Sequence, residues 1–170
     1  MTRAVLSIGS NLGDRLAMLR SVVDGLGDAV REVSPVYETA PWGGVEQGPF
    51  LNAVVVAEDD ALDAPGWLRR AHEFEQAAER VRARRWGPRT LDVDIVACRA
   101  DGREVISHDE TLTLPHPRAH ERAFVLVPWL AVEPDAVLSV DGRVRRVDDL
   151  IAALDAAERN GVRRTDLVLR

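Results

Sequence analysis

The residues most able to do chemistry lie in one short stretch, between residues 80 and 94. Asp92 and Asp94 stand one residue apart near its end, within an otherwise apolar run. Alternate side chains of a strand share a face, so these carboxylates would lie about 6 to 7 Å apart. They repel each other unless a cation separates them. The pair is typical of a Mg²⁺ site, because this ion binds few carboxylates and keeps water or phosphate ligands. The alternative is two solvated acids on an exposed face.

An arginine cluster precedes the acids. Such a cluster repels itself, and an anion with several phosphates relieves the repulsion through charge-assisted, often bidentate, hydrogen bonds. The alternative is a solvated helix end, where cations favour the negative pole of the dipole. Trp86, within the cluster, can stack on a base or on an arginine. Acids and arginines together predict phosphoryl chemistry on a nucleotide. The cluster consists of Arg80, Arg82, Arg84, Arg85 and Arg89.

Two further places are candidates for ligand contact. Phe50 and Asn52 follow a Gly- and Pro-rich loop over residues 39–49 and share one face of the next strand. A ring beside an amide suits a flat heterocycle with donor and acceptor edges, although a core Phe and a turn-capping Asn is equally compatible. His116 lies between two prolines, which fix its backbone for either a phosphate contact or simple packing.

Composition narrows the function classes. The chain has 170 residues, 46% of them hydrophobic and 29% charged, which predicts one globular domain with a real core. Its formal net charge of -6 requires any anion site to be a local basic patch. All 22 basic residues are arginine, which excludes a Schiff-base lysine and a Walker A motif. A single cysteine, Cys98, excludes an internal disulfide, and no signal peptide or membrane span is apparent, so we expect a cytoplasmic protein.

Apolar periodicity predicts the order β-α-β-β-α-β, the ferredoxin-like split βαβ arrangement. We expect an α+β sandwich in a single domain over 1–170, with a mixed, mostly antiparallel sheet and helices packed on it. The predicted elements are a strand over 4–8, a helix capped by Asp14 and ended by Gly27, an extended segment over 31–38, a strand over 50–58, a helix from Pro65 and a strand over 91–98.

The remainder of the chain has weaker signals. We expect a turn at Asp101-Gly102, a short strand over 104–106, and partial helix over 118–131 that Pro128 breaks. An amphipathic helix over 147–158 should end at Asn160-Gly161. Residues from about 140 to 170 contain no motif, and we interpret them as a C-terminal extension packed on the domain.

Five segments, in this order, resemble the 6-hydroxymethyl-7,8-dihydropterin pyrophosphokinase family. Members have a ferredoxin-like α+β fold. They transfer the β,γ-pyrophosphoryl group of ATP to the hydroxymethyl oxygen of the pterin, with Mg²⁺, and release AMP in folate biosynthesis. The most specific segment is Arg85-Trp-Gly-Pro-Arg-Thr-Leu-Asp-Val-Asp-Ile95. The others are Gly9-Ser-Asn-Leu-Gly13, Phe50-Leu-Asn-Ala53, Leu114-Pro-His-Pro117 and Arg122-Ala-Phe-Val-Leu126.

The resemblance implies a role for each matching residue. Two Mg²⁺ ions would bind Asp92 and Asp94, which with Arg82 and Arg89 form the catalytic set. ATP would contact Arg80, Arg85, Trp86, Ile95, Thr113, His116 and Arg122. The pterin would lie between Phe50 and Phe124, with its edge at Thr39, Pro41, Trp42 and Asn52. The chain departs from the family pattern at Ala40, Trp42, Phe50 and Thr111. A monomer with only ATP and the hydroxymethyl pterin as partners, and no nucleic acid or membrane, is implied.

Two other classes of function are compatible with part of this pattern. Ferredoxin-like domains with arginine and aromatic side chains also bind RNA, but the RNP1 pattern is missing and the net charge is acidic. An inactive homologue that only binds a pterin or a nucleotide is the other class. Retention of both acids and of the arginine cluster argues against it.

Overall fold

A computed structural model of the chain describes residues 1–40, 48–82 and 91–170, with only the backbone of residues 80–82. Its centre is an antiparallel sheet in which β1 (Thr2–Ser10) lies between β4 (Phe50–Asp59) and β5 (Asp92–Ala100). Seven described strands form the sheet, with all pairings antiparallel. The others are β2 (Val30–Val33) and β3 (Tyr37–Thr39) beside β4, β6 (Arg103–Glu104) beside β5, and β11 (Val162–Arg164) beside β3.

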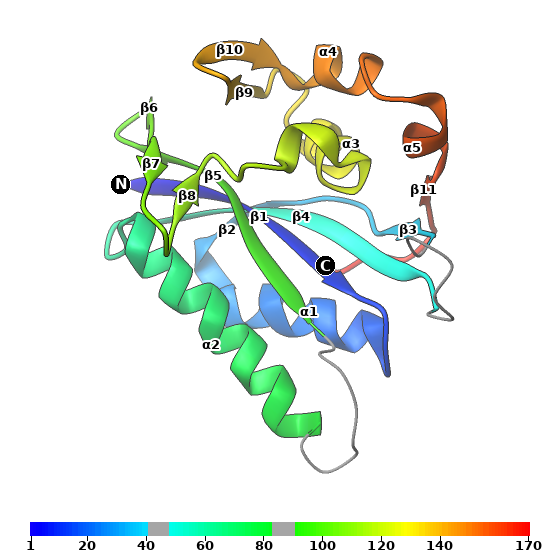
Figure 1. Cartoon of the computed structure of the whole chain (residues 1–170). Coiled ribbons are helices and arrows are strands. Elements are labelled where there is room, and N and C mark those ends of the chain that lie inside the picture. Colours follow the sequence, from blue (N-terminus) through cyan, green and yellow to red (C-terminus); the bar gives the residue numbers. More distant parts are fainter. Residues whose placement is uncertain (41–47, 83–90) are drawn as a thin grey trace.

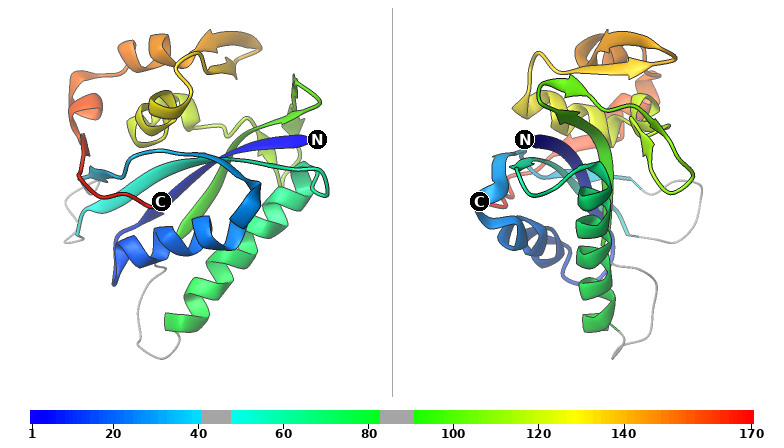
Figure 2. Two further views of the ribbon diagram at one scale, coloured as in Figure 1. Left: turned by 180° about the vertical axis from the view of Figure 1, so that it is seen from behind. Right: turned by 90° about the vertical axis from the view of Figure 1, so that its left-hand side faces the viewer.

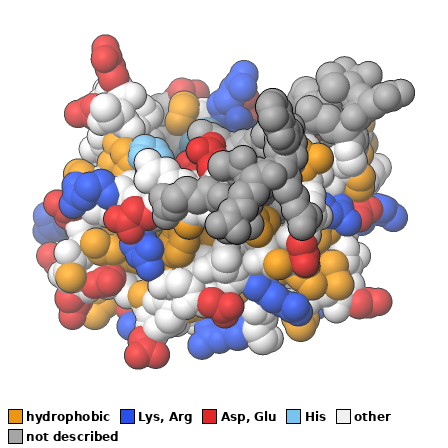
Figure 3. Space-filling view, turned by 90° about the horizontal axis from the view of Figure 1, so that it is seen from below, with side chains coloured by type: hydrophobic (Ala, Val, Ile, Leu, Met, Phe, Trp, Pro, Cys, Tyr) orange, Lys and Arg blue, Asp and Glu red, His pale blue; other side chains and the backbone are white. Residues whose placement is uncertain are grey.

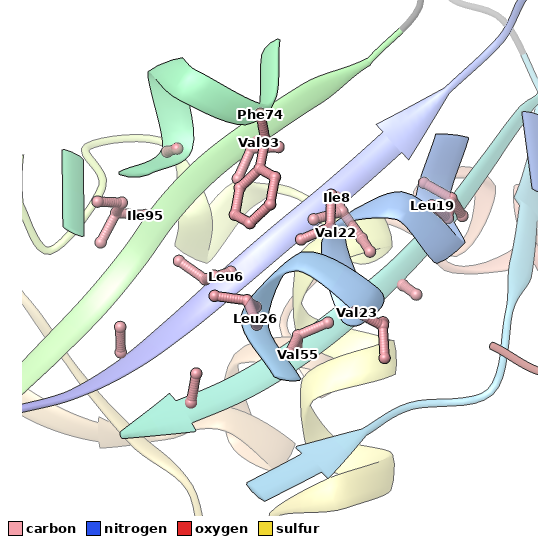
Figure 4. Close-up of a cluster of buried hydrophobic side chains, with 14 of the residues drawn as sticks. Leu6, Ile8, Leu19, Val22, Val23, Leu26, Val55, Phe74, Val93 and Ile95 are labelled. Atoms are coloured by element: carbon pink, nitrogen blue, oxygen red, sulfur yellow. The ribbon is translucent and has the colours of Figure 1, made fainter. Parts of the chain in front are cut away.

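Helices α1 (Arg15–Leu26) and α2 (Ala64–Arg82) cover one face of this sheet (Figure 1). The Asp14 carboxylate accepts a hydrogen bond from the Ala17 N–H, which caps α1, and Gly27 ends the helix with a positive φ of 54°. Between helices and sheet lies a continuous apolar core (Figure 4). It includes Leu6, Ile8, Leu19, Val22, Val55, Phe74, Val93 and Ile95.

The opposite face is covered by α3 (Ala123–Val132) and by the C-terminal elements, as the two turned views make clear (Figure 2). Trp129 and Leu126 of α3 pack on Val54, Val56 and other β-strand valines in a second core. The order β1-α1-β2/β3-β4-α2-β5 confirms the predicted ferredoxin-like α+β fold, with β2 and β3 sharing the place of one strand. On the same face, residues of β1, β4 and β5 remain open in a cavity beside the start of α3.

Two sequence predictions about helices were wrong. Pro128 does not break its helix, because α3 runs through it. Proline removes one hydrogen bond, but Val125, Leu126 and Trp129 are buried on the sheet, and their burial outweighs that loss. The helix expected over 147–158 is two short helices, α4 (Val147–Ala152) and α5 (Ala156–Asn160). The chain turns between them, and Arg159 donates from Nη1 to the Ala152 carbonyl across the turn.

Small elements complete the fold. The strands β7 (Ser107–His108) and β8 (Thr113–Leu114) form a hairpin, as do β9 (Val137–Val140) and β10 (Arg143–Arg146). A short 3-10 helix, η1 (Gly27–Ala29), follows α1, and a second, η2 (Ala119–Glu121), precedes α3. In the described part of the chain, no helix combines the length and the apolar character that crossing a membrane requires.

Candidate active site

The register of three strands brings the predicted polar residues together. Gly9, on the central strand β1, is paired with Asn52 of β4 on one side and with Asp92 of β5 on the other. Two residues earlier, Ser7 is paired with Asp94 in the same way. Directly paired residues share a face, so the acids, Ser7 and Asn52 all lie on the face that carries α3.

These residues line a cavity of about 450 Å³, within the usual range for a small-molecule site. The sheet forms its floor, and the start of α3 with the turn before it forms one wall. It is lined by Ser7, Gly9, Thr39, Ala40, Phe50, Asn52, Asp92, Asp94, Arg118, Glu121, Arg122 and Phe124.

One half of the cavity suits a flat heterocycle. Asn52 is buried, and its Nδ2 donates a hydrogen bond of 2.7 Å to the Thr39 hydroxyl. This bond fixes the amide plane, so the second Nδ2 hydrogen and Oδ1 are held in set directions. Phe50, at the start of β4, and Phe124, in the first turn of α3, are half-buried and line the same cavity. The alternative of a core Phe and a turn-capping Asn is therefore not what the structure contains.

The other half contains the acids. Asp92 and Asp94 are half-buried, while Leu91, Val93 and Ile95 are buried on the helix side, so the predicted two-faced strand is confirmed. The Val93 N–H lies between the acids and donates a 3.0 Å hydrogen bond to Oε2 of Glu75 on α2. This bond fixes the backbone from which both carboxylates project. Arg122 Nη1 lies 4.0 Å from Asp94 Oδ2, and the Arg122 guanidinium lies over the Phe124 ring at 5.5 Å.

His116 is held beside the acid half of the site. The backbone N–H of His116 donates to the Val96 carbonyl at 2.8 Å. This bond holds the loop against β5, two residues after Asp94. Its Nδ1 accepts from the Arg118 N–H at 3.2 Å, so a neutral ring carries its proton on Nε2. Burial lowers the pKa of His116 below its ordinary value, against the opposing effect of Asp94. The ring is therefore a neutral donor at pH 7 rather than a cation.

The remaining predicted residues are placed as follows. Ile95 lies in the core under the helices, on the face opposite the acids. Thr113 is exposed on β8 and donates to the Asp109 carbonyl. Arg80 and Arg82 belong to the last turn of α2, of which the backbone is described. Pro41, Trp42, Arg85, Trp86 and Arg89 lie outside the described residues.

Sequence reasoning missed residues that shape the cavity without an obvious chemical group. Gly9 and Ser7 belong to its floor, and Arg118 and Glu121 to its wall. Gly9 had a signal in the Gly9–Gly13 motif, which we interpreted as a structural turn. Arg118 is a basic residue two positions after His116, which could have indicated a place in the site. Ser7 has no such signal, and only its pairing with Asp94 in the β1–β5 register places it there.

The antiparallel α+β fold, with paired carboxylates beside an aromatic and amide pocket, defines a ferredoxin-like domain with a small-molecule site on one face of its sheet. The sequence model of the 7,8-dihydro-6-hydroxymethylpterin-pyrophosphokinase (HPPK) family matches residues 5–134, so the chain belongs to this family. The predicted family and the predicted class of enzyme, a pyrophosphokinase, are both confirmed.

Relatives extend the match over most of the chain. The chain is 62% identical over 176 residues to the 2-amino-4-hydroxy-6-hydroxymethyldihydropteridine pyrophosphokinase of Mycobacterium leprae, covering 100% of this chain and 92% of that protein. The protein of the same name from Mycobacterium tuberculosis is 60% identical over 168 residues, covering 96% and 89%. That of Methylorubrum extorquens is 45% identical over 159 residues, covering 91% and 95%.

Among solved structures, the chain is similar in fold to the HPPK-DHPS protein of Plasmodium falciparum. The TM-score is 0.62 at 13% sequence identity, over 88% of this chain and 44% of that chain. This chain thus spans less than half of that longer protein. At such identity the likeness concerns the fold alone.

Proposed function

We propose that the chain transfers the β,γ-pyrophosphoryl group of ATP to the hydroxymethyl oxygen of 6-hydroxymethyl-7,8-dihydropterin, giving the pterin diphosphate and AMP for folate biosynthesis. The observation that carries the proposal is the strand register around Gly9. Asn52 and Asp92 are separated by two strand spacings, about 10 Å. This suits a bicyclic heterocycle with its polar edge at Asn52 and its substituent oxygen near the acids.

The residues proposed to hold Mg²⁺ are Asp92 and Asp94. Two half-buried carboxylates supply hard oxygen ligands, and Mg²⁺ typically takes few protein ligands and completes its shell with phosphates and water. The donor set therefore fits a metal bound together with ATP better than one bound to the protein alone. Bound Mg²⁺ would neutralise charge on the triphosphate and align it for in-line transfer. The number of ions, two by the family resemblance, is part of the proposal.

Arg122 and His116 are proposed to contact the phosphates. Arg122 is the described cation nearest to an acid of the pair, and it can bind an anion through its fork of N–H groups. Neutral His116 with its proton on Nε2 is a hydrogen-bond donor to a phosphate oxygen without adding a charge. Arg80, Arg82, Arg85 and Arg89, with Trp86, are proposed to supply further contacts, and Thr113 to border the nucleotide. Ile95 would contribute only backbone atoms there, because its side chain is buried on the face opposite the acids.

The pterin is proposed to stack between Phe50 and Phe124. Stacked aromatic rings prefer offset contact, and their burial supplies most of the affinity. Asn52 and Thr39 would fix the orientation of the ring by reading its amide-like edge, and Pro41 and Trp42 would add to that edge. Orientation matters because transfer needs the hydroxymethyl oxygen in line with β-phosphorus.

The deciding experiment is a coupled assay for AMP release, with and without the hydroxymethyl pterin. We expect release only when the pterin is present. Asp94→Asn should lose roughly 30- to 1000-fold in kcat/KM, about 2 to 4 kcal/mol of transition-state stabilisation, as for removal of one electrostatic partner. Asp24→Asn, an exposed change on α1, serves as the matched control. Near-normal turnover of Asp94→Asn in saturating Mg²⁺ and ATP would refute the metal role.

The same assay separates the other classes. An RNA-binding module would release no AMP and would bind RNA with a steep salt dependence. In the view from below, acidic and basic side chains are mixed on the described part of this face (Figure 3). An inactive homologue would bind the pterin without turnover. We also propose a cytoplasmic, single-domain monomer, to be checked by light scattering and fractionation.

A further inference from the structure

The C-terminal segment, residues 156–164, lies outside the range matched by the family model, yet it contacts both walls of the cavity. On one side β11 pairs with β3, with Val162 opposite Thr39. The Ala40 N–H also donates to the Gly161 carbonyl at 3.4 Å. On the other side α5 reaches α3, and Figure 1 shows the segment running from α4 past α3 to β3. The segment therefore connects the two places where the proposed pterin site is built.

The contact with α3 is a specific hydrogen bond. Oε1 of Glu158 accepts from the Ala123 N–H at 3.1 Å. Ala123 is the first residue of α3 and is fully buried, and Arg122, the capping residue, makes no capping hydrogen bond of its own to any described residue. The first N–H groups of a helix have no partner within the helix, so a buried one needs an acceptor from elsewhere. A carboxylate also suits the positive pole of the helix dipole.

The position of this bond matters more than its strength. Ala123 stands between Arg122 and Phe124, both of which line the cavity. Arg122 approaches Asp94, and its guanidinium lies over the Phe124 ring. A shift of the Ala123 peptide would therefore move a proposed phosphate contact and a proposed stacking ring together.

We infer that Glu158 is a positioning residue, which fixes the start of α3 so that Arg122 and Phe124 meet the two substrates. The inference rests on the proposed function. It assigns a role in the reaction to the part of the chain in which no motif is visible. A mere brace for the fold is the competing explanation, and it makes different predictions.

The test compares three variants: Glu158→Ala, which removes the acceptor, Glu158→Gln, which keeps an Oε1 acceptor, and Arg159→Ala as the control. Arg159 lies on the same short helix but bonds to Ala152 rather than to α3. For Glu158→Ala we expect KM for the pterin and for ATP to rise roughly tenfold, the effect of losing one hydrogen bond of this kind, with kcat within about twofold. Glu158→Gln should return both KM values to near wild type, and Arg159→Ala should leave them unchanged.

Equilibrium binding of the pterin, followed by its fluorescence, is the second readout. Unchanged KM and dissociation constants in Glu158→Ala, with only the melting temperature lowered, would overturn the inference in favour of a brace. The positioning role is equally refuted if Arg159→Ala raises KM as much as Glu158→Ala does. In a Phe124→Ala background, Glu158→Ala should add little to the loss of pterin affinity, because the residue through which it acts is gone. A full additive loss would also overturn the inference.

Failure of the proposed function is a separate outcome. If the wild-type protein binds the pterin but releases no AMP, the transfer reaction is wrong, while the binding comparison still decides the role of Glu158. If the wild-type protein binds no pterin, both the function and the inference fall.

Discussion

Gly9 gives the sharpest prediction, because a single methyl group added there meets a proposed substrate contact. A Cβ atom on Gly9 would lie 2.8 Å from Oδ1 of Asn52. Real Cβ atoms do not approach oxygen so closely, so Gly9→Ala must displace one of the two. The backbone of Gly9 is held between β4 and β5 and cannot yield easily. The Asn52 amide has to move instead.

The free-energy cost of displacing the Asn52 amide follows from the hydrogen bond that holds it. Asn52 is buried and donates to the Thr39 hydroxyl at 2.7 Å, so displacement breaks this bond or tilts it. Loss of a buried hydrogen bond that leaves a partner unsatisfied costs about 1 to 3 kcal/mol. The same movement misaligns the edge that we propose for the pterin. A pterin group that can no longer bond to this amide is left unsatisfied at a similar cost of about 1 to 3 kcal/mol, so we expect pterin affinity to fall roughly 5- to 150-fold.

The assay separates the two substrates. KM or the dissociation constant for the pterin should rise by that factor, while ATP binding should change less than about twofold, because the acids keep their places. Gly48→Ala is the matched control, since its added methyl would meet no described atom closer than 3.7 Å. Equal losses for pterin and ATP, or normal pterin affinity in Gly9→Ala, would show that Asn52 is not held as argued.

Two further predictions concern other parts of the fold. Glu75→Ala removes the acceptor of the Val93 N–H, so kcat should fall roughly tenfold. Glu75→Gln, which keeps an acceptor oxygen, should restore the rate. A normal rate in Glu75→Ala would show that this bond does not support the acids. Burial raises the pKa of Cys98 to about 12, so the folded protein should resist thiol reagents at pH 8 and react only after unfolding. The thiol of the unfolded chain ionises near its ordinary pKa of about 8.5, whereas the folded one stays protonated. The contribution of Cys98 to the free energy of unfolding should therefore be complete at neutral pH and decline above about pH 9. A denaturation series against Cys98→Ala checks the slope.

The described parts of the first hundred residues, 1–40, 48–82 and 91–100, were predictable because their local signals agree with the tertiary structure. Asp14 and Gly27 mark the ends of α1, and the continuous valines of β4 identify a strand buried on both faces. The alternation around Asp92 was sufficient to predict which side chains face the core. Such agreement between levels is typical of a sequence with one favoured fold.

The C-terminal third was less predictable, because contacts distant in sequence decide it. The apolar run around Pro128 indicates burial, but nothing in it indicates that the helix continues through the proline. The 147–158 pattern is amphipathic, yet the chain turns at residues 153–155, and Glu158 then reaches α3. β11 is short and polar in sequence, and only pairing with β3 makes it a strand.

The candidate site also has one part that local sequence signals predict and another that depends on contacts distant in sequence. The acids, Asn52 and Phe50 were predictable because their chemistry is visible in the residue type and their spacing places them on strands. What brings them into one cavity is register, which a one-residue slip would destroy by turning every side chain to the other face. The groups that hold them are of another kind: a missing side chain at Gly9, and carboxylates at positions 75 and 158 that accept backbone N–H groups. Gly9 belongs to the Gly9–Gly13 motif, which the sequence alone presents as a structural turn, whereas the two carboxylates have no local pattern, since any acceptor of the right length serves. The groups proposed to bind the substrates can therefore be predicted from the sequence, whereas the contacts that position them are visible only in the structure.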